Sequence, residues 1–243
     1  MHLIVLAAGL GQRLGELTRA TPKALISVAG RTLIDYALAF ARQAGGAPRI
    51  VVGGFGYEEL ARHVAEVDPG ATLVENRDFR QGNLLSLVTG RGALPVDAGF
   101  HLMNTDHIYP PGVARIVAET AATASEVTAF CDFDRSLGAD DMKVELDAQR
   151  RVRRMSKQLA GWQAGYVGMT FVPAARRAAY DAAVERVRQG VGPAAHVEQV
   201  LVALAELGAP PVIADISGHG WHEVDEPHER DRAEAALRAR PLQ

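Results

Sequence analysis

The chain has 243 residues, of which 48% are hydrophobic and 23% charged, and this composition excludes a largely disordered or collagen-like protein. The formal net charge is −3, so there is no basic excess and a nucleic-acid partner is not expected. The single cysteine, Cys131, excludes an internal disulfide framework and a zinc site built from cysteines.

The N-terminal sequence MHLIVLAAGL continues directly into a glycine-rich segment. No basic region precedes its apolar residues, so it is a poor signal peptide. No stretch of the chain reaches the roughly 18 uninterrupted apolar residues that a membrane span needs. We therefore expect a cytoplasmic protein without a membrane span.

Short apolar runs rich in β-branched residues alternate with helix-period segments through the first half of the chain. The predicted strands cover residues 4–7, 50–52, 71–74 and 100–103. A first helix should begin at Thr32, where Asp35 completes a capping box. Further helices are predicted at 57–67, 83–89 and 113–122. This order predicts a mostly parallel sheet with helices on both faces.

The pattern changes after Glu126. Strand-like runs follow one another without long helices between them, at 127–133, 142–146, 152–155 and 166–171. Amphipathic helices are predicted at 174–188, 197–207 and 227–238. We therefore expect an α/β fold with three layers, α/β/α, a mixed and mostly parallel central sheet, and a smaller antiparallel sheet on the substrate side. One domain is expected, with a nucleotide-binding half at about 1–125 and an acceptor-binding half at 126–243.

The segment LAAGLGQRLG, residues 6–15, places glycines directly after a predicted buried strand. Glycines in such a loop let backbone N–H groups approach a ligand, and Arg13 adds the permanent cation that a phosphate site needs. A plain strand-to-loop turn and the dinucleotide site of a nicotinamide oxidoreductase are alternatives. No acid follows on the next strand and Thr21-Pro22 interrupts the segment, so the oxidoreductase is disfavoured.

A second motif, TPKAL at 21–25, follows closely. Proline stiffens the chain, so Lys23 should be held at a defined point near the glycine-rich loop. Together, LAAGLGQRL and TPKAL resemble the paired motifs of the nucleotidylyltransferases that activate sugar phosphates and phosphoalcohols. The resemblance extends to GRTLI at 30–34, and to NRDFRQGNLLSL at 76–87, which is similar to a segment of the cytidylyltransferases.

Two further segments carry the resemblance. NTDH at 104–107 lies at the position of the family's metal-binding aspartate, and WHEVDEP at 221–227 is similar to its closing motif. The resemblance implies that Asp106 and Asp225 bind Mg²⁺, which needs only one or two carboxylates beside phosphate oxygens and water. Glu223 stands where the family often has aspartate. As ordinary alternatives, Asp106 would end a strand and Asp225 would begin a helix.

The resemblance also implies roles for the other residues. Arg13 and Lys23 would be catalytic, Arg13 holding the leaving phosphates and Lys23 bridging the α-phosphate and the incoming phosphate. The nucleotide would be bound by Leu6, Ala7, Ala8, Gly9, Gly11, Gly82, Asn83 and Ser86. Helix capping by Asn83 and burial of Ser86 are the structural alternatives.

Candidate acceptor-binding residues are His107, Lys157 and Tyr166. The function predicted is transfer of CMP from CTP to a phosphorylated alcohol or phosphonate. The inositol-1-phosphate cytidylyltransferases are among the enzymes resembled, in the segment DHIY at 106–109. A sugar-1-phosphate or molybdopterin-type nucleotidylyltransferase that uses another nucleotide is an alternative, and a non-catalytic nucleotide sensor is another. A homodimer is possible.

Overall fold

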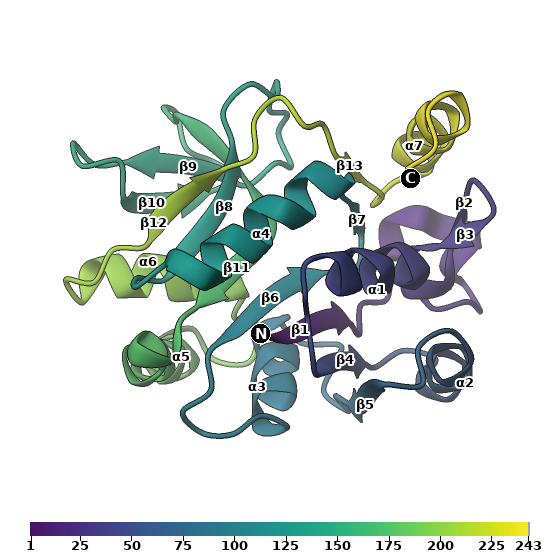
Figure 1. The fold of residues 1–243 in the computed structure, drawn as a ribbon, viewed down its shortest axis with the longest axis horizontal. Coiled ribbons are helices and arrows are strands. Elements are labelled where there is room, and N and C mark those ends of the chain that lie inside the picture. The colour runs from purple at the N-terminus through teal and green to yellow at the C-terminus, as the bar shows by residue number, and fades with distance from the viewer. Residues whose placement is uncertain (243) are drawn as a thin grey trace.

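The computed structural model describes residues 1–242, and strands alternate with helices through the first half of the chain (Figure 1). Four strands pair in the order β6-β1-β4-β5, all of them parallel. They are β1 His2–Ala7, β4 Arg49–Gly53, β5 Ala71–Glu75 and β6 Phe100–Asn104. Each lies where the sequence predicts a strand. Because the strands are parallel, the segments that follow β1 and β6 meet at one edge of the sheet.

The strands of the second half extend this same sheet to nine strands. Their bounds are β8 Thr128–Asp132, β9 Lys143–Leu146, β10 Val152–Ser156, β11 Ala164–Val172 and β12 Val212–Asp215. β11 runs antiparallel to β6, β8 and β9, and β9 runs antiparallel to β10. The predicted α/β fold with a mixed sheet is thus confirmed, and the antiparallel strands join the central sheet through β11.

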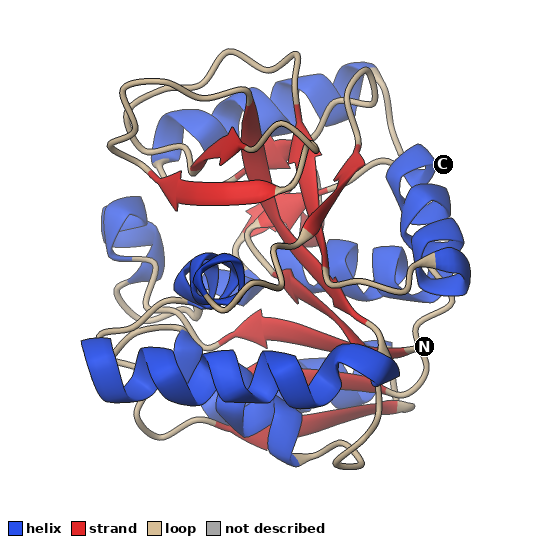
Figure 2. Ribbon diagram, turned by 90° about the vertical axis from the view of Figure 1, so that its left-hand side faces the viewer, coloured by secondary structure: helices blue, strands red, loops and turns tan. Residues whose placement is uncertain are grey.

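Helices cover both faces of the sheet, which forms the middle layer in Figure 2. One face packs against α1 Leu33–Gln43, α2 Tyr57–Val67 and α4 Pro111–Thr123. The other packs against α3 Leu84–Gly92, α5 Arg177–Val191 and α6 Val197–Glu206. The alternation along β1 explains why it is apolar from Leu3 to Ala7: Leu3 and Val5 enter the first core, and Ile4 and Leu6 enter the second.

Several short elements were not predicted from the sequence. They are β12, the 3₁₀ helices at Gln12–Thr18 and Lys23–Leu25, the hairpin of β2 Ser27–Val28 and β3 Arg31–Thr32, and the pair formed by β7 His107–Ile108 and β13 His222–Glu223. The helix predicted at 174–188 begins as the 3₁₀ turn Ala174–Arg176 and continues as α5. The last helix, α7 Pro227–Ala239, packs with β2 and the first 3₁₀ helix in a third core. Most of these elements have two to four residues, too few to show a periodicity in the sequence.

The capping box predicted at the start of α1 is present. Thr32 Oγ1 accepts a hydrogen bond from the Asp35 backbone N–H at 3.2 Å, and Asp35 Oδ2 accepts one from the Thr32 N–H at 3.0 Å. This cap fixes the start of α1 directly after β3.

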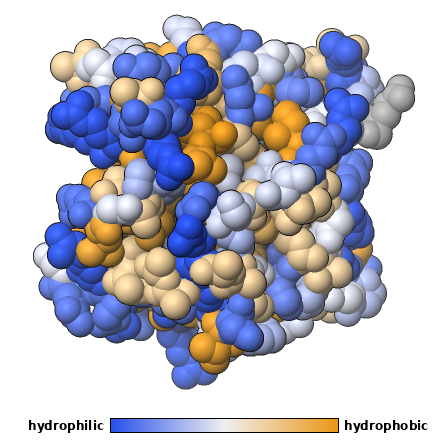
Figure 3. Space-filling model, turned by 60° about the vertical axis from the view of Figure 1, so that its left-hand side comes forward, coloured by the Kyte–Doolittle hydropathy of each residue, from blue (hydrophilic) through white to orange (hydrophobic). Residues whose placement is uncertain are grey.

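Apolar side chains on the face shown in Figure 3 are spread among hydrophilic ones in separate patches. Within residues 1–242, no helix combines the length and apolar content needed to cross a bilayer. The homodimer stays a prediction.

Candidate functional site

A cavity of about 400 Å³ lies at the edge of the sheet where β1 and β6 end. It is bordered by the glycine-rich loop, by the TPKAL segment and by residues 104–106. The predicted site residues that line it are Leu6, Ala7, Ala8, Gly9, Gly11, Arg13, Lys23, Asn83, Ser86, Asp106 and Asp225. The structure thus brings together residues that are far apart in the sequence.

Gly11 is the point at which the two N-terminal motifs touch. Its φ is +64°, in the left-handed region that glycine adopts without strain. A Cβ at this position would lie 2.9 Å from Cβ of Lys23, so a side chain here would displace the lysine. The hydroxyl of Thr18 donates a 2.7 Å hydrogen bond to the Gly11 carbonyl and fixes the loop. Lys23 is therefore packed directly against the glycine-rich loop.

The charged side chains of the cavity form one continuous network. Lys23 Nζ donates to Asp106 Oδ2 at 2.8 Å and also to Asp225 Oδ1. The Arg13 guanidinium bonds Asp225 as well, and reaches Asp140 at 3.0 Å. The Lys23 side chain is only 11% exposed and that of Asp225 only 16%, so these charges are poorly screened by solvent.

The β7–β13 ladder brings the two aspartates together across 119 positions of sequence. Glu223 pairs with His107 in this ladder, and the Val224 N–H donates to the Asp106 carbonyl at 2.8 Å. The backbone N–H of Asp225 is in turn held by Glu229 Oε2 at 2.9 Å, at the start of α7. The first turn of α7 and the end of β6 therefore fix the two carboxylates against one ammonium group.

Asp106 also contacts its sequence neighbour. His107 Nδ1 lies 2.6 Å from Asp106 Oδ1. Burial by itself raises the pKa of Asp106, but the charges of Lys23 and His107 outweigh it, so the pKa is held well below its ordinary value. Burial lowers the pKa of His107, but the Asp106 carboxylate outweighs it and the pKa is raised. Asp106 is therefore an anion at neutral pH.

His107 forms part of a buried aromatic wall. Its ring stacks on Trp221 at 5.1 Å and on Tyr109 at 5.7 Å between centroids. On β11, Gly168 has a φ of +73°, and a Cβ there would lie 3.2 Å from the His107 ring. The absence of a side chain at Gly168 thus leaves room for the imidazole. The sequence analysis did not identify Gly168, because a single glycine in a strand says nothing of what it faces.

The donors in the cavity suit a hard divalent cation. Asp106 and Asp225 converge on the Lys23 ammonium, so their oxygens already surround a point of positive charge. Glu223, Asp106 and His107 also offer ligand atoms within 4.8 Å of one another. Carboxylate oxygens without thiolates are the ligands that Mg²⁺ takes in proteins. The residues present fit the predicted magnesium ion.

The residues predicted to bind the nucleotide base differ in what they contact. Ser86 is buried, and its hydroxyl accepts a 2.9 Å hydrogen bond from the Asn76 amide. Asn83 Oδ1 accepts from the Val197 N–H at 2.9 Å, so it caps α6 rather than its own helix. Gly82 does not line the cavity. A Cβ at position 82 would overlap the Ala195 carbonyl oxygen. The backbone of Gly82 therefore packs against the segment before α6.

The residues predicted to bind the acceptor are not brought together in the cavity. Lys157 is exposed just after β10, and its carbonyl accepts from the Lys143 ammonium at 2.7 Å. Tyr166 lies in the core, with its hydroxyl 2.8 Å from that of Thr170. His196, which is not among the predicted binding residues, does line the cavity. The acceptor roles of Lys157 and Tyr166 stay predictions.

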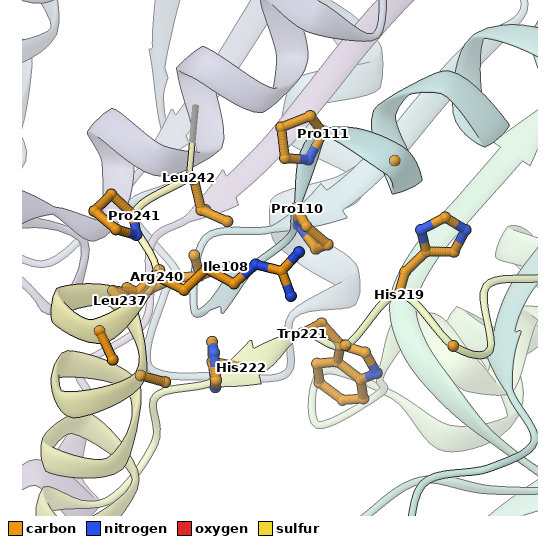
Figure 4. A pocket seen from close by; sticks show the side chains of 15 residues that line it. Ile108, Pro110, Pro111, His219, Trp221, His222, Leu237, Arg240, Pro241 and Leu242 are labelled. Atoms are coloured by element: carbon orange, nitrogen blue, oxygen red, sulfur yellow. The ribbon is translucent and has the colours of Figure 1, made fainter.

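A separate cavity of about 830 Å³ adjoins the site at Trp221 (Figure 4). It lies between the start of α4 and the end of α7, and the Arg240 and His219 side chains border it. None of the predicted site residues lines this cavity. The charged groups that suit phosphate chemistry gather in the smaller cavity.

Known proteins share both the sequence and the fold. Residues 3–207 match the family described as the MobA-like NTP transferase domain. The chain is 32% identical over 120 residues to a 2-aminoethylphosphonate cytidylyltransferase from Lancefieldella rimae, covering 47% of this chain and 48% of that protein. It is 29% identical over 230 residues to a bifunctional IPC transferase and DIPP synthase from Rubrobacter xylanophilus, covering 93% and 49%. The chain thus spans about half the length of these two relatives.

Among solved structures, the inositol-1-phosphate CTP transferase from T. maritima superposes with a TM-score of 0.80 and 19% identity, over 100% of this chain and 97% of that one. This likeness confirms the fold. The resemblance inferred from the paired N-terminal motifs is confirmed by the family match, which begins at residue 3 and covers both motifs. The chain belongs to the MobA-like NTP transferase family.

Proposed function

We propose that this protein transfers CMP from CTP to a phosphorylated alcohol or a phosphonate and releases pyrophosphate. The observation that carries the proposal is the meeting of Arg13, Lys23, Asp106 and Asp225 in one cavity beside the glycine-rich loop. Both reactants are anions, so the site must neutralise charge and align the two groups more than it must supply a nucleophile.

In the reaction, an oxygen of the acceptor phosphate or phosphonate forms a bond to the α-phosphorus of CTP. The bond from that phosphorus to the oxygen leading to the β-phosphate breaks, and pyrophosphate leaves with the electron pair. The acceptor oxygen is already ionised at neutral pH, so no general base is needed. His107, whose Nδ1 contacts Asp106, is therefore free of that role.

Lys23 is placed to act on both reacting groups. Its ammonium is held in the floor of the cavity, and its stem packs on Gly11. When phosphates enter, the ammonium can exchange a carboxylate for the α-phosphate and the incoming oxygen, because lysine is a compact charge on a flexible stem. Arg13 lies further out, at 43% side-chain exposure, where the β- and γ-phosphates would reach it.

Magnesium held by Asp106 and Asp225 would neutralise the phosphate charge that develops in the transition state. These carboxylates would then no longer need the lysine as their partner. Asp106 and Asp225 would thus hold Lys23 in the empty site and the metal in the occupied one. Binding of the metal with the charged substrate would then release the Lys23 ammonium.

The pyrimidine would lie against Ala7, Ala8 and Ser86 in the part of the cavity lined by the backbone of the glycine-rich loop. The relatives named as cytidylyltransferases support CTP, and one of them is named for a phosphonate acceptor. The sugar-phosphate and molybdopterin-type alternatives differ in base or acceptor but use the same charged residues.

A pyrophosphate-release screen tests the proposal. The protein is assayed with Mg²⁺, each of the four ribonucleoside triphosphates, and a panel of phosphorylated alcohols, sugar 1-phosphates and phosphonates. We expect release that requires CTP and a phosphoalcohol or phosphonate together. Release with a sugar 1-phosphate and another nucleotide would select the alternative, and binding of nucleotide with no release for any pair would indicate a sensor.

A further inference from the structure

His107 contacts a candidate metal ligand, but the proposed reaction gives it no task. Its Nδ1 lies 2.6 Å from Asp106 Oδ1, while Lys23 Nζ donates to the other oxygen, Asp106 Oδ2, at 2.8 Å. Each oxygen of this carboxylate therefore has its own partner. The His107 residue is only 6% exposed and does not line the cavity, so its contacts are with the protein.

The imidazole ring of His107 is held between two other rings. The rings of Trp221 and Tyr109 stack on it at 5.1 and 5.7 Å between centroids, each inclined by 17°. Both outer rings are bonded to the main sheet: Trp221 Nε1 donates to Asp132 Oδ2 at 2.8 Å, and the Tyr109 hydroxyl donates to the Val167 carbonyl. Because these acceptors belong to β8 and β11, the plane of the imidazole is fixed relative to the sheet.

A second buried histidine shows what packing alone looks like in this protein. His101, in β6, is fully buried and lies edge-on to the Phe130 ring at 5.2 Å, and neither of its ring nitrogens has a hydrogen-bond partner among residues 1–242. The ring of His107 differs because one nitrogen faces a carboxylate. A glycine within a strand costs stability, and Gly168 in β11 makes room for the one of these two imidazoles that binds a carboxylate.

Trp221 also belongs to the segment that carries the second aspartate. It lies directly before β13, and Asp225 follows that strand by two residues. Within the strand, Glu223 pairs with His107 across the β7–β13 ladder. The stacked rings therefore connect the segment of Asp106 with the segment of Asp225, and a shift of the imidazole would change how the two carboxylates face each other.

We propose that His107 and Trp221 are positioning residues for the cation site. His107 donates its Nδ1–H to Asp106 Oδ1, which leaves Oδ2 as the oxygen that faces the cation, and the Trp221 ring holds the imidazole in the orientation that this hydrogen bond needs. The inference rests on the metal role of Asp106 in the proposed function. Hydrogen-bonded partners of this kind orient metal ligands, and their loss weakens metal binding by about 10- to 100-fold.

The test measures cation affinity directly, with Mn²⁺ as the probe because it takes the same oxygen ligands as Mg²⁺ and has an electron paramagnetic resonance signal. Mn²⁺ is titrated into each protein alone and with α,β-methylene-CTP, which cannot release pyrophosphate. H107F and H107L remove the N–H donor and keep an apolar side chain, whereas H107N keeps a donor near the position of Nδ1. H101F is the matched control, because it makes the same replacement at a buried histidine whose nitrogens have no partner in the described chain. Circular dichroism and thermal melting check that each variant folds.

We expect H107F and H107L to weaken Mn²⁺ binding by about 10- to 100-fold, H107N to lie close to wild type, and H101F to match wild type. W221L removes the flat ring surface and should weaken Mn²⁺ binding by about three- to tenfold, and W221F should restore most of this loss. In the pyrophosphate-release assay, H107F should raise the Mg²⁺ concentration that gives half-maximal activity. It should leave the KM of the acceptor at saturating Mg²⁺ unchanged.

An unchanged Mn²⁺ affinity in H107F and H107L would overturn the inference, as would an equal loss in H101F or a wild type that binds no Mn²⁺. A raised KM of the acceptor at saturating Mg²⁺ would assign His107 to acceptor binding instead. Strong ¹⁴N couplings in the spectrum of bound Mn²⁺ that vanish in H107F would make His107 a metal ligand, and this too would overturn the inference.

Two outcomes are separated by the choice of variants and probe. If neither H107F nor H107L folds, the Trp221 variants carry the test, and equal Mn²⁺ affinities of W221L and W221F would overturn the inference. If the wild type releases no pyrophosphate with any substrate pair, the proposed function fails. A weaker Mn²⁺ affinity of H107F than of wild type and H101F would then still support the positioning role.

Discussion

Lys23 is the residue on which the charge network of the site depends. It is the common partner of Asp106 and Asp225, and it packs on Gly11, so one side chain connects both N-terminal motifs with both metal-binding candidates. Removing its charge should therefore affect catalysis more than any other single change in the cavity.

Replacing Lys23 by Met keeps most of the packing volume and removes the ammonium. We expect turnover to fall by about a thousandfold, because a preorganised cation that stabilises the transition state contributes on this scale. The rate is measured as pyrophosphate release under saturating CTP and acceptor. Circular dichroism should show an unchanged fold, and a turnover within a few-fold of wild type would exclude the assigned role.

Replacing Asp106 by Asn removes one of the two carboxylates without changing its shape. The Mg²⁺ concentration that gives half-maximal activity should rise by about tenfold or more, and turnover should fall, because the ion loses a charged ligand. Asp97→Asn, on an exposed loop, is the control. An unchanged dependence on Mg²⁺ in the Asp106 variant would contradict the metal role.

Contacts between elements hold the two sides of the cavity in place. The loop before α3 carries Gly82, which packs against the Ala195 carbonyl ahead of α6, and Asn83 caps α6 across the same gap. The segments before α3 and before α6 thus meet through backbone contacts that only glycine permits at position 82.

Substituting Gly82 by Ala should force α3 and α6 apart, because a Cβ would overlap the Ala195 oxygen. We expect a loss of about 2–4 kcal/mol in the free energy of unfolding measured in urea. The matched control is Gly92→Ala at the end of α3, where an added Cβ meets nothing within 4 Å. Equal free energies of unfolding for the two variants would contradict the prediction that a Cβ at position 82 destabilises the protein.

Asp68 fixes the end of α2 to β4. Arg49 donates to it at 2.6 and 2.8 Å, and Arg42 at the end of α1 is 3.2 Å away. The hydrogen bonds from Arg49 lower the pKa of Asp68 below its ordinary 3.8, despite an opposing effect of burial. Because folding lowers the pKa of Asp68, the ion pair with Arg49 contributes fully to the free energy of unfolding above pH 3.8. This contribution is lost as the pH falls through the pKa of Asp68 in the folded protein.

The Asp68→Asn variant should therefore be less stable than wild type at pH 7, by about 1–3 kcal/mol. The difference should shrink as the pH is lowered below about 4. Urea unfolding of both proteins between pH 3 and pH 7 measures it. A difference that stays constant across this range would mean that the ion pair does not contribute through its charge.

Across the whole molecule, the sequence predicts the elements well because the core strands and helices are long and periodic. β1, for example, is apolar from Leu3 to Ala7, as a central parallel strand must be. The convergence of Asp106 and Asp225 could be expected only from resemblance to a family, because the β7–β13 ladder that produces it has two residues on each side.

The residues predicted to bind the nucleotide mostly line the cavity, whereas those predicted to bind the acceptor do not. Tyr166 and Thr170 are hydrogen-bonded to each other where the pairing of β11 with β8 shifts register, close to Gly168 with its positive φ. Side chains still alternate across that irregularity, with Tyr166 and Val172 in one core and Phe171 in the other. Strand alternation could assign Tyr166 to a face of the sheet, but it could not show that helices α5 and α6 bury this face.

The central claim is that an acceptor oxygen attacks the α-phosphorus of CTP in this cavity. The most direct test uses 2-aminoethylphosphonate and ethylphosphonate labelled with ¹⁸O at all phosphonate oxygens, with product analysis by mass spectrometry. The account predicts that the CMP–phosphonate product keeps the complete label, including the bridging oxygen, and that the pyrophosphate carries none. Label in the pyrophosphate, or unlabelled CMP as the only product, would contradict it.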